Sequence, residues 1–366
     1  MNERIPQSVP ASFEGPSKFK AHIESVVADA ETDIQTQERD PLSMDSFLIE
    51  ELPGLNARAD AHTILQRVQQ VLPDAQVLSS YSLPDARAAL RDLGHVAASL
   101  RRHGVQAGDI PEYSQALLLL SARTDEVPRD TVFSYGPRNP DGNRRRTFTD
   151  ISQEHIFIDS FKTGMTHLYA GISALGRAYE GGPESTAWIE ECETARTNFE
   201  GMVQAIKQVR QEVSPEVFTN ELRPYFEPLQ IDGRTYFAPG GAQMPVLLYD
   251  QLLWGTDSGD QQYRSYLADN LTYSPPAIRN LSALQEGSPS MLTQCVEGGN
   301  RDAAQALVGV FNSMLRFRAP HKRVAEENFA LRSNFAVGSG GYTPVILDLL
   351  TNHLLAARNT LLVAYE

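Results

Sequence analysis

Cysteine is scarce in this 366-residue sequence, and the two cysteines that it has form no recognisable pattern. Cys192 and Cys295 stand about a hundred residues apart with no CxxC pair, so a thiolate zinc site is not indicated. Two distant cysteines also cannot build the disulfide framework that stabilises small secreted domains. We therefore expect a chain that is held together by its hydrophobic core.

Long apolar runs and an excess of positive charge are missing too. No apolar run approaches the ~20 residues that span a bilayer, and residues 1–16 lack the apolar core of a signal peptide. The formal charge of −14 argues against nucleic-acid binding, and two short basic runs, 101–103 and 144–146, are expected to be solvated surface. With 41% hydrophobic and 21% charged residues, the sequence predicts a folded, soluble, acidic protein of the cytoplasm.

The familiar catalytic patterns are also absent. The sequence contains no HExxH pair, no GxxxxGK[ST] loop, no GxSxG turn and no GxGxxG after an expected strand. A glycine cluster at 338–341 lacks the lysine of a phosphate loop. It places flexible backbone and the hydroxyl of Ser339 between two apolar helices, which fits either a ligand-lining loop or a plain helix connection.

The hydrophobic periodicity of the chain is that of helices. A β-type alternation is sparse, with only 234–237 suggesting a brief hairpin, and 50–55 has the composition of a turn. The fold class is therefore predicted to be mainly α. Helices are expected at 17–34, 64–72, 84–103, 113–122, 151–179, 185–213, 214–225, 246–254, 301–318, in a short segment after Pro320, and at 345–365.

A loop-like stretch at 128–149, rich in proline, glycine and asparagine, is the best candidate for a domain boundary. We expect a polar N-terminal extension (1–45), a smaller helical region (46–140) and a large helical domain (141–366). The sequence contains no internal repeat of fixed period, so a repeat architecture is not indicated.

His321 is the most informative of the eight histidines. It follows Pro320, which predicts the start of a helix, and it stands in a segment that alternates apolar and cationic residues. An imidazole on a rigid helix is the usual proximal ligand of haem iron, and the guanidinium groups of Arg316 and Arg318 would suit the haem propionates. The alternative is a structural histidine, which is the interpretation given to the other seven.

Two blocks of sequence are distinctive: 315–321 (LRFRAPH) followed by 338–342 (GSGGY), and 221–228 (ELRPYFEP) continuing to 253–255. Both resemble the monodechloroaminopyrrolnitrin synthases, haem enzymes that rearrange the indole ring of chlorinated tryptophan. Weaker similarity extends forward to about residue 45. That family is similar in turn to indoleamine 2,3-dioxygenase, so the resemblance implies a small N-terminal helical region over a large helical haem domain.

The resemblance implies roles for several residues. His321 matches the proximal iron ligand, Ser339 matches a serine beside the substrate, and Gly340 belongs to the loop that passes over the haem. Arg223 falls where the dioxygenase relatives place an arginine that binds the substrate carboxylate. An ion pair with Glu221 or Glu227 is the alternative for this arginine.

Two further positions follow from the same resemblance. Ser160 aligns with the distal-side serine of the dioxygenases, and helix packing is its alternative role. Phe329 stands where the pyrrolnitrin enzymes carry a tyrosine, so a hydroxyl that could hold substrate or transfer a proton is missing. Tyr342 is common to both and cannot be assumed to replace that hydroxyl.

Together these features predict an enzyme that uses haem b to oxidise, or oxidatively rearrange, tryptophan or a substituted, possibly halogenated, tryptophan in secondary metabolism. Dioxygen or a peroxide would be the oxidant, and an electron donor would remain to be identified. Two alternatives stay open. One is ring opening of the tryptophan 2,3-dioxygenase type, and the other is a haem-binding sensor.

Overall fold

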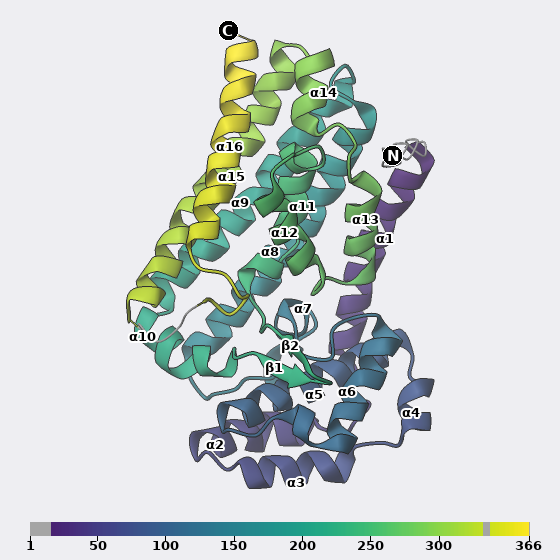
Figure 1. The fold of residues 1–366 in the computed structure, drawn as a ribbon, viewed down its shortest axis with the longest axis vertical. Helices are drawn as coiled ribbons and strands as arrows, with labels where there is room; N and C mark the ends of the chain where they lie inside the picture. The colour runs from purple at the N-terminus through teal and green to yellow at the C-terminus, as the bar shows by residue number, and fades with distance from the viewer. Residues whose placement is uncertain (1–15, 332–336, 366) are drawn as a thin grey trace, which may run out of the picture.

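A computed structural model describes residues 16–331 and 337–365 of the chain, and its fold is mainly α, as the sequence predicted (Figure 1). Long helices form a body to which a layer of shorter helices is attached at one end. The helices of the body are α1 (Pro16–Gln37), α8 (Ser152–Gly181), α9 (Thr186–Glu212), α11 (Val246–Asp250), α12 (Gln261–Leu271), α13 (Pro276–Gln285), α14 (Met291–Gly298), α15 (Arg301–Leu331) and α16 (Val345–Ala364). Those of the layer are α2 (Leu52–Ala57), α3 (Ala61–Val71), α4 (Ala75–Ser80), α5 (Leu83–Arg102) and α6 (Pro111–Thr124).

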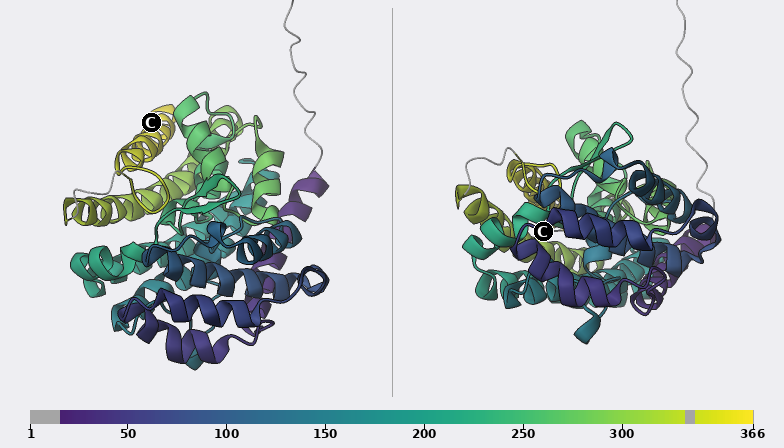
Figure 2. Two further views of the ribbon diagram at one scale, coloured as in Figure 1. Left: turned by 60° about the horizontal axis from the view of Figure 1, so that its bottom comes forward. Right: turned by 90° about the horizontal axis from the view of Figure 1, so that it is seen from below.

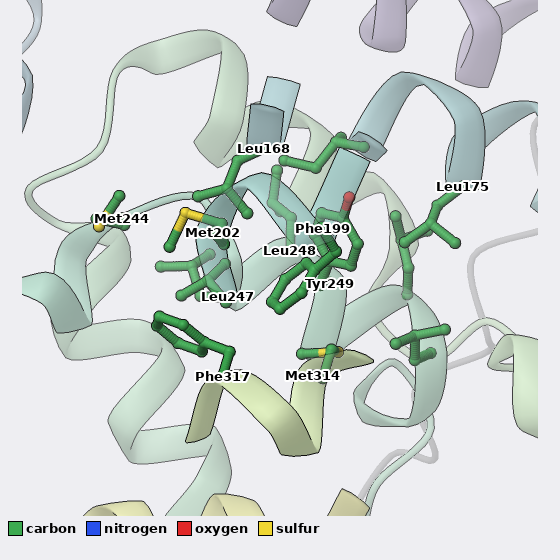
Figure 3. Packing of buried hydrophobic residues seen from close by; sticks show 14 of the residues in the cluster. Leu168, Leu175, Phe199, Met202, Met244, Leu247, Leu248, Tyr249, Met314 and Phe317 are labelled. Carbon is green, nitrogen blue, oxygen red and sulfur yellow. The ribbon is translucent and has the colours of Figure 1, made fainter. Parts of the chain in front are cut away.

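The body is a stack of helices in which α9 packs between α8 and α15, and α16 packs on α15. Figure 3 shows side chains of α8, α9, α11 and α15 meeting in its core, and Leu168, Phe199, Leu248 and Met314 are each fully buried there. Burial of the apolar side chains along one side of each helix stabilises that helix far more than its intrinsic helix propensity does. No helix within the described residues is apolar over enough of its length to cross a membrane.

The layer has a separate cluster of buried hydrophobic residues, drawn from 42–120. A short antiparallel hairpin, β1 (Leu229–Ile231) and β2 (Arg234–Tyr236), adds two buried residues of β1 to this cluster and so joins the two parts (Figure 1). Figure 2 shows the purple and blue helices of the layer from two further directions. The hairpin confirms the strand expected at 234–237. Helix α1 packs on α8 and α13, and its apolar residues belong to the core of the body. Residues 1–15 of the expected extension lie outside the described part of the chain.

Three local predictions were wrong. Helix α15 continues through Pro320, where a new helix was expected, because strong helix formers flank the proline and α15 packs along α9. Residues 50–55 are helical, since Leu52 and Leu55 are buried in the layer. In the basic run 144–146, Arg146 is only 1% exposed and pairs with Asp45 and Asp92.

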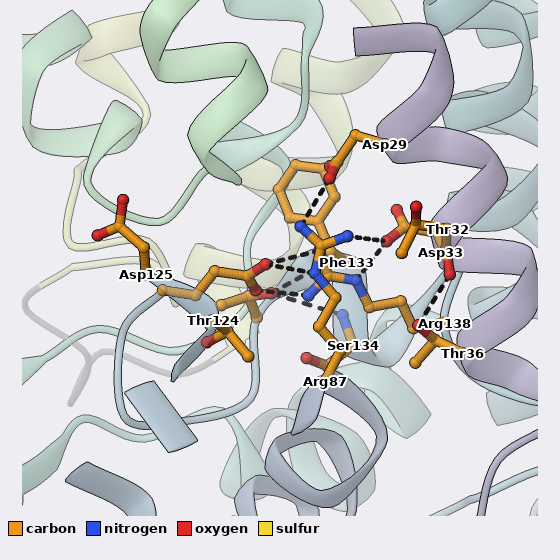
Figure 4. Close-up of polar contacts among 12 residues, drawn as sticks. Asp29, Thr32, Asp33, Thr36, Arg87, Thr124, Asp125, Phe133, Ser134 and Arg138 are labelled. Atoms are coloured by element: carbon orange, nitrogen blue, oxygen red, sulfur yellow. Dashed lines mark hydrogen bonds and ion pairs between the residues drawn. The ribbon is translucent and has the colours of Figure 1, made fainter. Parts of the chain in front are cut away.

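Buried charges connect the layer to the body. Arg87 of α5 and Arg138 share the carboxylate of Glu126, with shortest nitrogen–oxygen distances of 2.9 and 2.5 Å. Figure 4 shows these two arginines side by side, facing Asp29 and Asp33. The same two arginines reach the carboxylates of Asp29 and Asp33 on α1, at 2.7 and 2.5 Å. Since each charge has a partner, the network fixes the position of α1 against the layer.

Candidate functional site

A cavity of about 260 Å³ lies between the ends of α9 and α15. Helix α8, the π-helical turn η4 (Phe218–Leu222), the start of α16 and two glycine-rich loops at 239–243 and 337–344 also contribute to its wall. Most of the wall is apolar, which suits a small aromatic ligand or cofactor. The polar groups that line it include His321, Arg223, Ser160 and Ser339, so the structure brings together residues from distant parts of the sequence.

His321 presents a neutral imidazole to this cavity. Burial, followed by the positive charge of Arg318, lowers its pKa to about 4. Its Nδ1 atom is buried and has no hydrogen-bond partner among the residues that the structure describes. The ring packs against Phe317, with ring centroids 5.2 Å apart. A neutral, unpartnered imidazole on a packed helix has a lone pair available for a metal ion.

The two glycine loops approach each other and the imidazole closely. A Cβ atom built on Gly240 would stand 3.1 Å from both the Gly340 nitrogen and the Ser339 Oγ. A Cβ atom built on Gly241 would stand 3.5 Å from Nε2 of His321. Larger residues would therefore push the loops apart or fill the space beside the histidine. Ser339 and Gly340 both line the cavity.

Ser160 and Phe329 also line the cavity, on α8 and α15 respectively. The Ser160 hydroxyl donates a 2.6 Å hydrogen bond to the Phe157 carbonyl within its own helix, as its packing role would require. The Phe329 ring lies 3.8 Å from the position that a Cβ atom on Gly338 would occupy, so it stands beside the glycine loop. Tyr342 lines the same cavity, but its hydroxyl donates to the Asp269 carboxylate at 2.6 Å.

Arg223 is buried, and its guanidinium already has protein partners. It donates to the Phe226 carbonyl at 2.5 Å, to Glu227 Oε1 at 2.9 Å and to the Val337 carbonyl at 3.4 Å. The ion pair that the sequence left open is therefore present, with Glu227. These bonds tie the turn at 223–227 to the start of the glycine loop.

Arg316 and Arg318, the candidates for binding propionates, are not among the residues that line the cavity. The exposed side chain of Arg316 pairs with Glu200 of α9. Arg318 is buried and pairs with Asp250 of α11. Each arginine is held by an acidic residue more than sixty positions away in the sequence, which local alternation of charge could not reveal.

Other cavity residues escaped sequence analysis. Arg210 and Glu327 line it from α9 and α15, and the hydroxyl of Thr219 in η4 is buried without a partner in the described structure. Arg210 follows an apolar stripe that is typical of an ordinary core-facing helix, so nothing in the sequence singled it out. Thr219 lies two residues before the block at 221–228, and only its place in the folded structure identifies it as a cavity residue.

The cavity residues fit haem. One neutral imidazole, apolar walls and glycine backbone close to the imidazole suit a large flat group with a single protein ligand. Both cysteines, by contrast, are buried and stand outside the cavity wall, and burial raises the pKa of each thiol.

The fold and the cavity define a mainly helical protein with an apolar small-molecule site, and His321 is the histidine that lines this site. The family model described as monodechloroaminopyrrolnitrin synthase PrnB matches residues 35–364. The chain belongs to this family, which confirms the resemblance seen in the sequence. It is accordingly an enzyme of oxidative, tryptophan-related biosynthesis.

Proposed function

We propose that this chain is a haem-dependent cytoplasmic enzyme that oxidises, or oxidatively rearranges, tryptophan or a substituted tryptophan such as a halogenated one. The observation that carries the proposal is the neutral imidazole of His321, which faces an apolar cavity and has no protein partner for its buried nitrogen in the described residues. Dioxygen or a peroxide serves as the oxidant, and a separate electron donor remains part of the proposal.

When bound, haem b supplies the iron at which the oxidant is activated. His321 is the residue that would hold it, and Gly241, which has no side chain, would leave space beside the imidazole. The aromatic and aliphatic wall buries the indole ring and excludes water. Ser339, the candidate catalytic residue, lines the cavity from the glycine loop, and its hydroxyl would hold a polar atom of the substrate.

Ring opening by dioxygen insertion is the second candidate reaction, and one observation favours it. Phe329 lines the cavity at the position where the pyrrolnitrin enzymes have a tyrosine. A reaction that needs no phenolic proton donor at this position is compatible with phenylalanine. Product analysis separates the two reactions, because an N-formylkynurenine-type product means ring opening and an arylpyrrole means rearrangement.

The proposal predicts that His321→Ala removes the Soret band of the purified protein and leaves its helical circular dichroism largely intact, because the iron loses its one protein ligand. The matched control is His62→Ala, an exposed histidine on α3 that should keep full haem occupancy. Unchanged haem content and spectrum in the His321 variant would refute the ligand assignment. Mass spectrometry of products from tryptophan and 7-chlorotryptophan then tests the substrate class.

A further inference from the structure

The cavity offers two guanidinium groups to a ligand within the described residues, those of Arg210 and Arg223. Their surroundings differ sharply. The side chain of Arg223 is 8% exposed and bonds to one carboxylate and two carbonyl oxygens. A substrate carboxylate could recruit it only by competing with these buried bonds, which is costly because Glu227 would lose its counter-charge.

Arg210 is held far more loosely. It stands on the last turn of α9, and its nearest acidic partner is Glu327 on α15, with 3.7 Å between Nη2 and Oε1. Both side chains are about 40% exposed, at 40% and 41%. Within the described part of the chain, no hydrogen bond is formed by this guanidinium. Exposed pairs of this kind contribute little to stability, so a ligand can separate them at small cost.

The position of this pair matches the shape of an amino acid. Arg210 and Glu327 lie at the exposed edge of a cavity whose inner wall is apolar, including Met202, Ile206 and Phe317. An aromatic amino acid has an apolar ring at one end and two adjacent opposite charges at the other. A cation and an anion from facing helices can accept both charges at once.

We propose that Arg210 and Glu327 together bind the charged end of the substrate, with the guanidinium on the α-carboxylate and the Glu327 carboxylate on the α-ammonium. The inference rests on the proposed function and deepens it, because it assigns the selection of a free amino acid to these two residues. Arg223 then holds the turn at 223–227 against the glycine loop and does not contact the carboxylate.

Calorimetric binding of three ligands to the holoenzyme tests this assignment. Tryptamine lacks the carboxylate of tryptophan, and indole-3-propionate lacks the ammonium. The wild type should bind tryptophan more tightly than either. Arg210→Gln should reduce the preference over tryptamine roughly five- to tenfold, and Glu327→Gln should reduce the preference over indole-3-propionate by a similar factor. Each variant should leave the other preference nearly unchanged.

Arg196→Gln is the matched control, because Arg196 is also an arginine of α9, pairs with Glu193 and is not among the lining residues. It should bind all three ligands as the wild type does. Arg223→Gln is the competing assignment. If this variant loses the preference over tryptamine and Arg210→Gln keeps it, the proposal is overturned.

A haem propionate is a second source of carboxylate in the same cavity. If Arg210→Gln lowers haem retention and keeps the tryptophan preference, Arg210 binds a propionate and the inference is wrong. A wild type that does not distinguish the three ligands would refute the amino-acid substrate itself, which is a failure of the proposed function. Wild-type preference that persists in both variants refutes only the inference.

Discussion

Residue 329 is a phenylalanine where the resemblance to the pyrrolnitrin enzymes implies a tyrosine. The ring of Phe329 lines the cavity and stands beside the glycine loop, but it carries no hydroxyl. The hydroxyl of Tyr342, which lines the same cavity, donates a hydrogen bond to the Asp269 carboxylate, and this bond fixes the orientation of the hydroxyl. The phenol of Tyr342 is therefore already engaged, and Phe329 adds no hydroxyl of its own to the cavity wall.

We expect wild-type protein to bind 7-chlorotryptophan and yield little arylpyrrole, and Phe329→Tyr to increase that product. A positioned proton donor is typically worth on the order of 10²-fold in rate. Mass spectrometry of products under identical turnover conditions measures the effect. Phe329→Leu is the control, because it changes the packing and adds no hydroxyl. Efficient arylpyrrole formation by the unmodified enzyme would contradict the expectation.

Individual site residues differed in how well the sequence revealed them. Ser339 and Gly340 could be predicted to line the cavity because each stands in a short, distinctive block. The partners of Arg316 and Arg318 could not, since Glu200 and Asp250 come from other helices. Periodicity describes one helix at a time, whereas these ion pairs depend on which helices become neighbours.

Among the elements, α15 is unusual in carrying Pro320 in its interior, one residue before the candidate ligand. Proline has no N–H group, so the carbonyl of Arg316 receives no helical hydrogen bond at that turn. The helix continues through the proline despite the missing hydrogen bond, because its packing against α9 and α16 stabilises it. A missing bond in this position loosens the turn that carries His321.

Pro320→Ala should therefore stabilise the protein and impair the site. Restoring the hydrogen bond and removing the ring should raise the free energy of unfolding by about 1–3 kcal/mol. The same change should shift the imidazole of His321 and so reduce haem occupancy, which the intensity of the Soret band measures. Pro276→Ala is the control, because Pro276 occupies the first turn of α13, where no helical bond is lost. Equal stability of the Pro320 variant and the wild type would argue against this account.

Helix limits followed closely from capping and periodicity where these signals were strong. The observed α9 runs from Thr186 to Glu212 and is capped by the hydroxyl of Ser185, which accepts from the Ala187 amide, close to the 185–213 expected. The π-helical turn η4 could not be anticipated, because 214–225 has an ordinary helical composition. Its extra residue per turn is a local register shift that periodicity does not resolve.

For the molecule as a whole, buried charge at the junction of layer and body was the least predictable feature. The run at 144–146 has the composition of a solvated loop, yet Arg146 lies beside Asp92 of α5, where Arg91 also pairs. His95, on the same helix, stacks on Phe148 with ring centroids 3.9 Å apart. The sequence predicted a structural role for this histidine, and the stacking agrees with that role. Its aromatic partner could not be foreseen from the sequence.

Acid should weaken this junction through His95. Burial lowers its pKa from 6.5 to about 4, so the unfolded chain takes up a proton as the pH falls below 6.5 while the folded protein does not. Stability due to this residue is therefore lost between pH 6.5 and 4, amounting to about 2 kcal/mol by pH 5. His95→Phe keeps a ring on Phe148 and should remove that part of the pH dependence.

Urea unfolding at about pH 7.5 and pH 5 measures the difference between variant and wild type. Comparing the two proteins cancels other titrating groups, among them Glu154, whose pKa burial raises to about 7 and which acts in the opposite direction. His62→Phe, on the exposed face of α3, is the control and should follow the wild type. An identical pH dependence in the His95 variant would rule out this residue as the cause.

Gly240 and the loop at 339–340 lie close together, although they are about a hundred residues apart in the sequence. A group that touches both loops, or that binds His321 and touches Gly241, makes these contacts only in the folded protein, so its binding stabilises the fold by mass action. A disulfide would instead restrict the unfolded chain, but both cysteines are free thiols. The occupant of the cavity would thus act as a removable link between distant segments.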